Sequence, residues 1–294
     1  MFMINRTKFL LVVLCLLGTA QAQVDELITR YAGENADGFI EPLITGFGAN
    51  LNSGLYRSAN IPVMGLHLNF GINAMAARFS DDQRTFVATT TGYFSPLQEV
   101  DVPTVIGDPK GASTVSPDGT EYVFPGGYDM ISFMIGVPSF TIGSIFGTEA
   151  TLRYFKARLN EELGDFSLFG IGARHSVSQY FPTLPLDIAA GIFYHKFKIS
   201  DIVTSNVYCL HAEVGKSLEI MDVYGGLAYE ANTARVEYTF DSGVETEDVS
   251  IDVTGKNKFR LTAGVGFNFT LFHINLDYNI GNQNVLNAGI SLGL

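Results

Sequence analysis

Apolar and polar residues alternate strictly over the last forty residues of the chain. Apolar side chains occupy odd positions from Phe259 to Phe269, even positions from Phe272 to Ile280, and even positions again from Leu286. This period of two predicts three β-strands, each with one apolar and one polar face. Such strands suit either a half-buried sheet or a barrel wall between lipid and a wet lumen.

The same alternation occurs upstream and predicts twelve strands, or fourteen if the long irregular segment hides a hairpin. The first nine are expected at Asn50–Ser58, 64–74, 86–93, 130–137, 140–154, 169–181, 186–194, 208–214 and 223–240. We expect Pro138-Ser139 to be a turn. The apolar phase of the ninth strand shifts near Ala234, which indicates a β-bulge.

The polar faces of these strands point to a shared interior. A soluble β-sandwich needs an apolar inner face, whereas here nearly every later strand has one fully apolar face that needs lipid to cover it. A transmembrane antiparallel up-and-down β-barrel is therefore the predicted fold over 50–294. Charged and imidazole side chains are the lumen-lining candidates: His67, Glu149, Arg153, Arg174, Asp187, His195, His211, Glu213, Arg260, His273 and Asp277.

The first 22 residues have the pattern of an export signal. Arg6 and Lys8 precede an apolar run from Phe9 to Leu17 that is too short to span a bilayer, and Ala20-Gln21-Ala22 fits a cleavage site. We therefore expect a signal peptide at 1–22 and an exported chain. Apart from Cys15, only Cys209 is present, so the exported chain is not a disulfide scaffold.

Residues 23–49 have helical rather than alternating spacing, with Pro42 expected in a first helical turn. We predict a short N-terminal helical plug in or under the barrel; a frayed leader is the alternative. Residues 95–128 are irregular and contain five prolines, and either fold back over the lumen or form a hairpin extension. The apolar side chains of these two segments are the gating candidates: Phe39, Leu43, Phe47, Val105 and Ile106.

The strand order predicts opposite ends for turns and loops. The connections at 182–185, 219–222 and 269–272 are short and fall on one side, which we assign to the periplasm together with the helices and the C-terminus. The segments 95–128 and 241–256 are the longest and fall on the other side. Short turns on one side and long loops on the other are typical of bacterial outer-membrane barrels.

Composition narrows the function classes. The formal net charge is −12, and loss of the signal would make the chain more acidic still, which argues against nucleic acid as a partner. His175 and Ser176 are neighbours on a strand and point to opposite faces, so they do not form a catalytic dyad. No Gly-x-Ser-x-Gly elbow is present. Cys209, His211 and Glu213 are only a loose metal-like set, so we predict no enzyme activity, metal or cofactor.

Several stretches resemble an uncharacterised family of exported barrel proteins of Gram-negative bacteria. They are Tyr31–Ala36, Phe47–Gly54, Phe146–Tyr154 and Arg174–Pro182. A helical hatch before a mid-sized barrel is more distantly similar to outer-membrane fatty-acid and hydrocarbon channels. Their Asn-Pro-Ala motif is missing, and Ser58–Pro62 is the nearest stretch, so their ligand residues are not carried over. The resemblance implies an outer-membrane location, with lipid, lipopolysaccharide and the barrel assembly machinery as partners.

Two functions follow as expectations. The barrel passes or binds a small, apolar solute, gated by the plug and the long loop. Alternatively, it is a structural or interaction barrel with a filled lumen and acidic extracellular loops.

Overall fold

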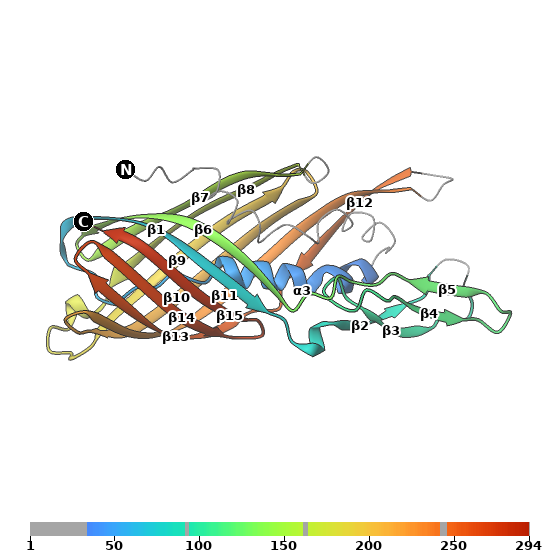
Figure 1. Cartoon of the computed structure of the whole chain (residues 1–294), viewed down its shortest axis with the longest axis horizontal. Coiled ribbons are helices and arrows are strands. Elements are labelled where there is room, and N and C mark those ends of the chain that lie inside the picture. The colour runs from blue at the N-terminus through green and yellow to red at the C-terminus, as the bar shows by residue number, and fades with distance from the viewer. Residues whose placement is uncertain (1–33, 92–93, 161–163, 242–245, 294) are drawn as a thin grey trace, which may run out of the picture.

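Ten antiparallel strands close into a barrel in the computed structural model, which describes residues 34–91, 94–160, 164–241 and 246–293 (Figure 1). Each strand pairs with its neighbour in sequence, β1 pairs with β15, and β10–β11 pairing completes the ring. The strands are β1 (Met64–Arg78), β6 (Ser132–Ile145), β7 (Thr148–Asn160), β8 (Gly164–Ser176), β9 (Asp187–Ile199), β10 (Val203–Ser217), β11 (Met221–Asp241), β13 (Phe259–Phe269), β14 (Phe272–Ile280) and β15 (Asn284–Gly293). β12 (Thr246–Thr254) pairs with the far half of β11, outside the ring.

The predicted class is confirmed, but the predicted count of twelve or fourteen strands is wrong. Residues 50–58 are not a strand, because they end a helix and continue through the lumen. The strand expected at 86–93 belongs to a separate small sheet, β2 (Thr85–Thr89) with β3 (Glu99–Pro103).

Pro138-Ser139 is not a turn. β6 runs through Pro138, which pairs with β1, while the β6–β7 ladder begins only at Ser139. Proline is tolerated there because its missing N–H has no ladder partner to serve. The hairpin turn lies instead at Phe146-Gly147, where both residues have positive φ (51° and 69°), as a type I′ turn requires.

β11 contains no bulge at Ala234. Its even-numbered residues face inward without interruption from Asp222 to Val236, and its pairings show no register shift. What changes is the environment inside the barrel: the inward residues up to Asn232 include the buried polar side chains of Asp222, Glu230 and Asn232 itself, whereas Ala234 and Val236 pack in an apolar cluster. The expected phase shift is therefore a change from polar to apolar filling.

The two ends of the barrel differ, as the sequence predicted. One end holds the connections at 146–147, 177–186, 218–220 and 270–271 together with Gly293, and we call it the turn end. The other, the loop end, holds 79–131 and the β11–β12 hairpin. Within the first of these, β2–β3 and the hairpin of β4 (Ala112–Val115) with β5 (Glu121–Phe124) extend beyond the ring (Figure 1). Both expectations for 95–128 are met in part: β4 and β5 form a hairpin extension, whereas Val105 and Ile106 pack against the helix at the loop end of the lumen. Short 3-10 helices lie at Asp81–Gln83 (η1) and Ser178–Tyr180 (η2).

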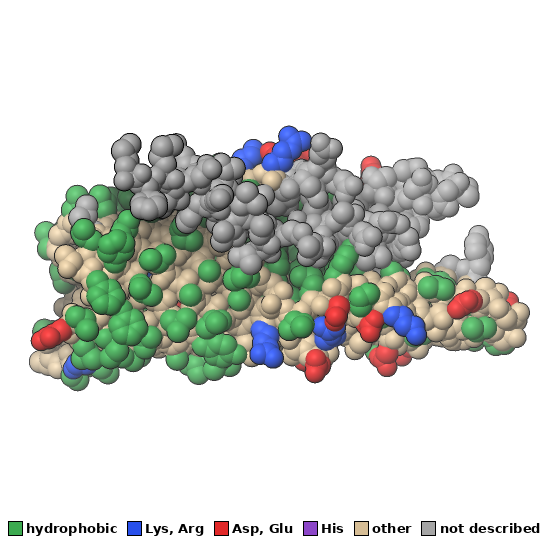
Figure 2. Space-filling model, viewed as in Figure 1, with side chains coloured by type: hydrophobic (Ala, Val, Ile, Leu, Met, Phe, Trp, Pro, Cys, Tyr) green, Lys and Arg blue, Asp and Glu red, His purple; other side chains and the backbone are tan. Residues whose placement is uncertain are grey.

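The outer face of the barrel is apolar. Figure 2 shows apolar side chains spread over the barrel wall, and charged ones are concentrated towards the ends and on the extension. Large side chains are exposed on it, such as Phe70 and Ile290, each about half exposed, and Leu227, which is two-thirds exposed. Apolar surface of this extent is stable only when it is covered, as lipid covers the outer wall of membrane barrels.

Inward-facing glycines make room for large inward side chains. His195 lies over Gly170, Phe193 over Gly172 and His211 over Gly191, and each pair is directly opposite in register on neighbouring strands. A Cβ on Gly172 would lie 2.1 Å from the Phe193 ring. These pairings keep the wall residues folded against the sheet, which leaves the axis of the narrow barrel free for another segment.

That segment is the chain that precedes β1. Helix α3 (Glu34–Leu51) lies at the loop-end side of the lumen, and residues 52–63 continue towards the turn end. We call residues 34–63 the plug. Asn35 exchanges two hydrogen bonds with Thr89 near the loop end, and the Val63 carbonyl accepts from Gly147 N–H at the turn end. The helix is continuous through Pro42, which lies mid-helix rather than in a first turn. No helix in the described part of the chain is long and apolar enough to cross a membrane. The expected signal peptide and residues 23–33 lie outside the described residues.

Candidate functional site in the lumen

The loop-end half of the lumen is sealed by apolar packing. Phe39 and Phe47 from α3 and Val105 and Ile106 from the long loop belong to one buried cluster, and Leu43 is partly buried against it. Val105 N–H donates to the Phe39 carbonyl at 2.9 Å, which ties the loop to the helix. All five gating candidates therefore meet in one layer; their gating role stays a prediction.

Aromatic stacking fixes the helix against the wall. The Phe47 ring lies 4.6 Å from both Phe133 on β6 and Phe197 on β9, measured between ring centroids. Met75 and Val137 on the neighbouring strands are also buried in this cluster. The side chains named here offer no polar group to water or to a polar solute in this layer.

Two arginines from the wall cap the end of the helix. Arg153 on β7 donates to the carbonyls of Leu51, Ser53 and Gly54, at 2.8, 3.1 and 2.5 Å. Arg260 on β13 donates to the Asn52 carbonyl at 2.5 Å. Cations at the C-terminal end of a helix satisfy its free carbonyls and oppose its dipole. These two candidates thus anchor the plug rather than line an open path.

Arg260 also connects the plug to β11. Its guanidinium lies 2.5 Å from a Glu230 carboxylate oxygen and 3.3 Å from the Tyr56 hydroxyl, and all three side chains are buried. The Tyr56 ring also packs against His211, 4.7 Å away between centroids.

A second ion cluster forms around Glu149 on β7. Arg174 on β8 donates to Glu149 through Nε at 2.8 Å, and to Glu213 on β10 at 2.6 Å. Arg57 from the plug reaches both Glu149 oxygens at 3.4 Å, and His67 Nε2 lies 3.2 Å from one of them. Arg174 also donates to the Ser58 carbonyl at 3.2 Å. Paired in this way, the buried charges are tolerated and again hold the plug to the wall.

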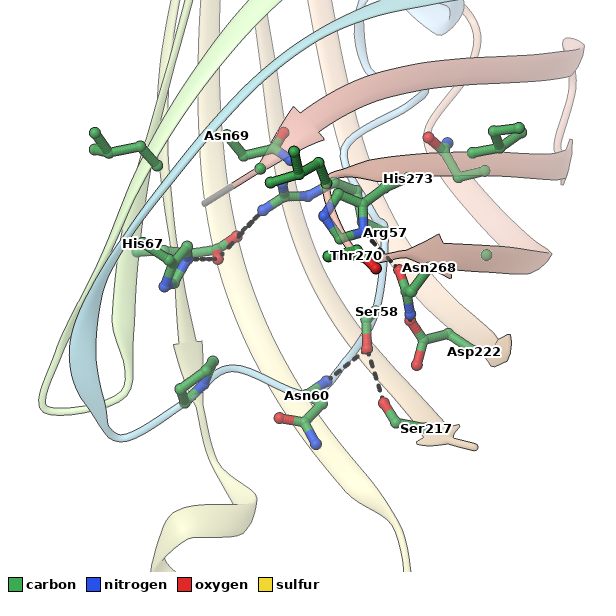
Figure 3. A pocket seen from close by; sticks show the side chains of 18 of the residues that line it. Arg57, Ser58, Asn60, His67, Asn69, Ser217, Asp222, Asn268, Thr270 and His273 are labelled. Atoms are coloured by element: carbon green, nitrogen blue, oxygen red, sulfur yellow. Dashed lines mark hydrogen bonds and ion pairs between the residues drawn. The ribbon is translucent and has the colours of Figure 1, made fainter. Parts of the chain in front are cut away.

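A cavity of about 410 Å³ opens below this cluster at the turn end (Figure 3). Arg57, Ser58 and Asn60 contribute the plug side, and His67, Asp222, Asn268 and His273 contribute the wall. A hydrogen-bonded row runs along one wall, because His273 Nδ1 lies 2.8 Å from Asn268 Oδ1 and Asn268 Nδ2 donates to Asp222 at 2.7 Å. Pro62 and Leu271 supply apolar lining. The cavity combines polar anchoring groups with some apolar surface, as small-molecule sites do.

The structure separates the eleven lumen candidates into distinct places. His67, Glu149, Arg174 and His273 line the cavity, and Glu213 pairs with Arg174 behind it. Asp277 is buried with donors from Asn279 and Asn287. His195 and His211 are buried, and neither ring nitrogen of either has a hydrogen-bond partner among the described residues. Asp187 is half-buried at the turn-end start of β9.

Sequence reasoning missed several residues of the site. Arg57 and Tyr56 were placed in a strand, although they belong to the plug and contribute a charge and a ring to the lumen. Asp222 and Glu230 lie on the even, inward-facing positions of β11, so the alternation of that strand could have identified them. Asn268 could have been found in the same way on β13.

The described residues form no group of three or more His, Cys, Asp or Glu side chains able to hold a metal ion. His175 and Ser176 do not form a pair with each other in the structure. The His175 ring lies 2.8 Å from the Thr148 hydroxyl and 3.0 Å from the Tyr180 hydroxyl, whereas Ser176 is buried beside Ser178.

The chain belongs to a family of unknown function, DUF6588, whose model matches residues 3–294. This confirms the expected resemblance to an uncharacterised family, and the structure adds that the fold is a closed antiparallel β-barrel. No curated protein matches the chain.

Among solved structures, Neisserial surface protein A is 10% identical, with 78% of this chain and 99% of that chain covered and a TM-score of 0.27. The translocator domain of the autotransporter NalP from Neisseria meningitidis is 12% identical, with 90% and 98% covered and a TM-score of 0.28. The toluene transporter TbuX of Ralstonia pickettii is 8% identical, with 81% and 92% covered and a TM-score of 0.22.

Proposed function

We propose that the chain is an outer-membrane β-barrel that binds a small solute in its turn-end cavity and is closed to free passage by residues 34–63. The apolar outer face around a polar interior supports the membrane location. The cavity ends at the ion cluster around Glu149, and the apolar layer around Phe47 closes the lumen beyond it. Passage from one end to the other therefore requires the plug to move.

The observation that carries this proposal is the way the plug is held. Wall arginines bind mainly backbone carbonyls of the plug, at Leu51, Asn52, Gly54 and Ser58. Backbone carbonyls in a lumen are readily hydrated once the segment shifts, so this attachment is reversible in a way that apolar packing alone is not. An apolar solute was the expectation from the sequence and stays a prediction. The lining of the cavity supports a solute with polar groups at this end.

A disulfide between plug and wall tests the gating. A Cβ on Gly46 in α3 would lie 3.7 Å from the Ala77 Cβ on β1, close to the separation in natural disulfides. The edge of the Phe79 ring, 2.9 Å from the same position, must shift slightly. We expect oxidised Gly46→Cys/Ala77→Cys protein to block solute flux into liposomes and the reduced protein to restore it. Gly46→Cys alone, treated in the same way, is the control.

A non-transporting barrel is the second candidate, favoured by how completely the plug and its ion pairs fill the middle of the lumen. It predicts no flux and no steady conductance in planar bilayers, in either redox state. Flux that is equal in the oxidised and reduced double variant contradicts the gating proposal and points to a path beside a fixed plug.

A further inference from the structure

Four basic side chains gather on the outer face of the barrel near its loop end. Lys156 and Arg158 point outward from β7, and Lys196 and Lys198 point outward from β9. Lys156 and Lys198 are both directly opposite Ser167 on β8, the strand between them. Arg158 and Lys196 are each two residues away from one of these two lysines along the same strand. In Figure 2, blue side chains gather at the upper edge, with red ones beside them, over the β7–β8 hairpin of Figure 1.

Three of these cations, Lys156, Arg158 and Lys198, lie beyond a row of exposed aromatic rings, and Lys196 is itself opposite Phe169 in that row. Tyr154 is two residues from Lys156 towards the turn end, and it is directly opposite Phe169 on β8. Tyr194 on β9 lies next to Tyr208 on β10, 5.0 Å between ring centroids. Aromatic rows of this kind lie at the level of lipid headgroups in membrane proteins. Two residues along a strand are about 6.6 Å, so the cations reach the height of the headgroup phosphates.

The group also frames a cavity. A hollow of about 440 Å³ is lined by three cations, Lys156, Arg158 and Lys198, by two carboxylates, Asp165 and Asp201, and by the hydroxyls of Ser167 and Ser200. Lys156 pairs with Asp165 at 3.2 Å, whereas Arg158 and Lys198 make no ion pair with another described residue. Two cations with free donors, a hydroxyl and a surface hollow fit a phosphate group. Such a basic group is unusual for a chain whose net charge is −12.

We propose that this surface binds the phosphorylated headgroup of an anionic lipid in the leaflet at the loop end of the barrel. In a bilayer whose outer leaflet is lipopolysaccharide, the phosphates of the lipid A moiety are the ligand of this chemistry. Arg158 and Lys198 bind the phosphate, Lys156 adds positive charge, and the acyl chains lie along the apolar wall below Tyr154. The inference rests on the proposed membrane location and assigns which leaflet the loop end occupies.

The test is lipid retention by full-length protein reconstituted in nanodiscs and measured by native mass spectrometry. With lipid A titrated into zwitterionic phosphatidylcholine, we expect wild type to retain lipid A. Lys156→Gln/Arg158→Gln/Lys198→Gln should bind it at least tenfold more weakly, since each basic residue near a charged surface contributes substantially. Lys216→Gln, which removes an exposed basic residue near the turn end, is the matched control and should behave as wild type.

Two further arms separate the possible outcomes. Inorganic phosphate added as a competitor should leave lipid A retention unchanged at millimolar concentration; displacement would mean that the site recognises phosphate alone, and it would overturn the assignment of a lipid site. Equal retention by wild type and the triple variant would overturn the proposal. Lys156→Gln/Lys198→Gln serves if the triple variant does not fold. Failure of wild type to enter nanodiscs at all would instead contradict the proposed membrane location.

Discussion

Arg260 shows why the polar residues inside this barrel are better understood as pairs than as a lining. It is almost fully buried, and it meets Glu230, the Asn52 carbonyl and the Tyr56 hydroxyl at once. Alternation along β13 predicts that Arg260 faces inward, and the structure agrees. The identity of its partners was beyond the sequence, because Glu230 and Asn52 are brought to it by strands and a plug that are distant along the chain.

Replacing Arg260 should destabilise the protein strongly. Arg260→Met leaves the Glu230 carboxylate buried without a cation, and we expect a loss of about 3–5 kcal/mol in the free energy of unfolding. The double variant Arg260→Met/Glu230→Gln should recover a large part of that loss. Urea titration in lipid vesicles, followed by the heat-dependent shift of folded barrel on gels, measures both.

Arg235 provides the matched control for this change. It pairs with Asp252 at 2.8 Å, but both side chains are more than half exposed. Exposed pairs of this kind contribute less than about 1 kcal/mol. A loss at Arg260→Met no larger than that at Arg235→Met would show that the lumen pair is solvated and does not anchor the plug.

At the scale of the element, strands were predicted well where one face meets lipid and poorly where it does not. β13, β14 and β15 match the alternation residue by residue. The stretch at 50–58 was mistaken for a strand because a plug inside a barrel needs the same mixture of polar and apolar residues. The apparent bulge in β11 arose because alternation records which face is apolar, and the inside of this barrel is polar at one end and apolar at the other.

The glycines of the strands also have a role that alternation does not reveal. Gly172→Ala places a Cβ 2.1 Å from the Phe193 ring, which is held by the packed interior. We expect a loss of about 1–3 kcal/mol in unfolding free energy, as for other overpacked cores. Gly136→Ala on β6 is the control, because its Cβ meets nothing within 4 Å, and it should be near neutral. Equal effects in the two variants would mean that glycine is required in these strands for its backbone alone.

At the scale of the whole molecule, the plug changes how the chain is threaded. An even number of strands was expected to keep the N-terminal helices and the C-terminus on the same side. Ten is even, yet the described chain begins near the loop end at Asn35 and finishes at the turn end at Gly293, because residues 34–63 first cross the lumen. The count of strands is not enough to place the helix when a segment passes through the barrel.

The same threading yields a test of orientation in cells. Val123 on β5 is 66% exposed on the loop-end extension, and Thr183 is exposed in the connection before β9 at the turn end. If the loop end faces outward, Val123→Cys should react with a membrane-impermeant maleimide on intact cells. Thr183→Cys should react only after the outer membrane is permeabilised. Cys209 is buried and gives a low background. Labelling of Thr183→Cys alone on intact cells would reverse the orientation and would place the solute cavity, rather than the basic lipid site, at the cell surface.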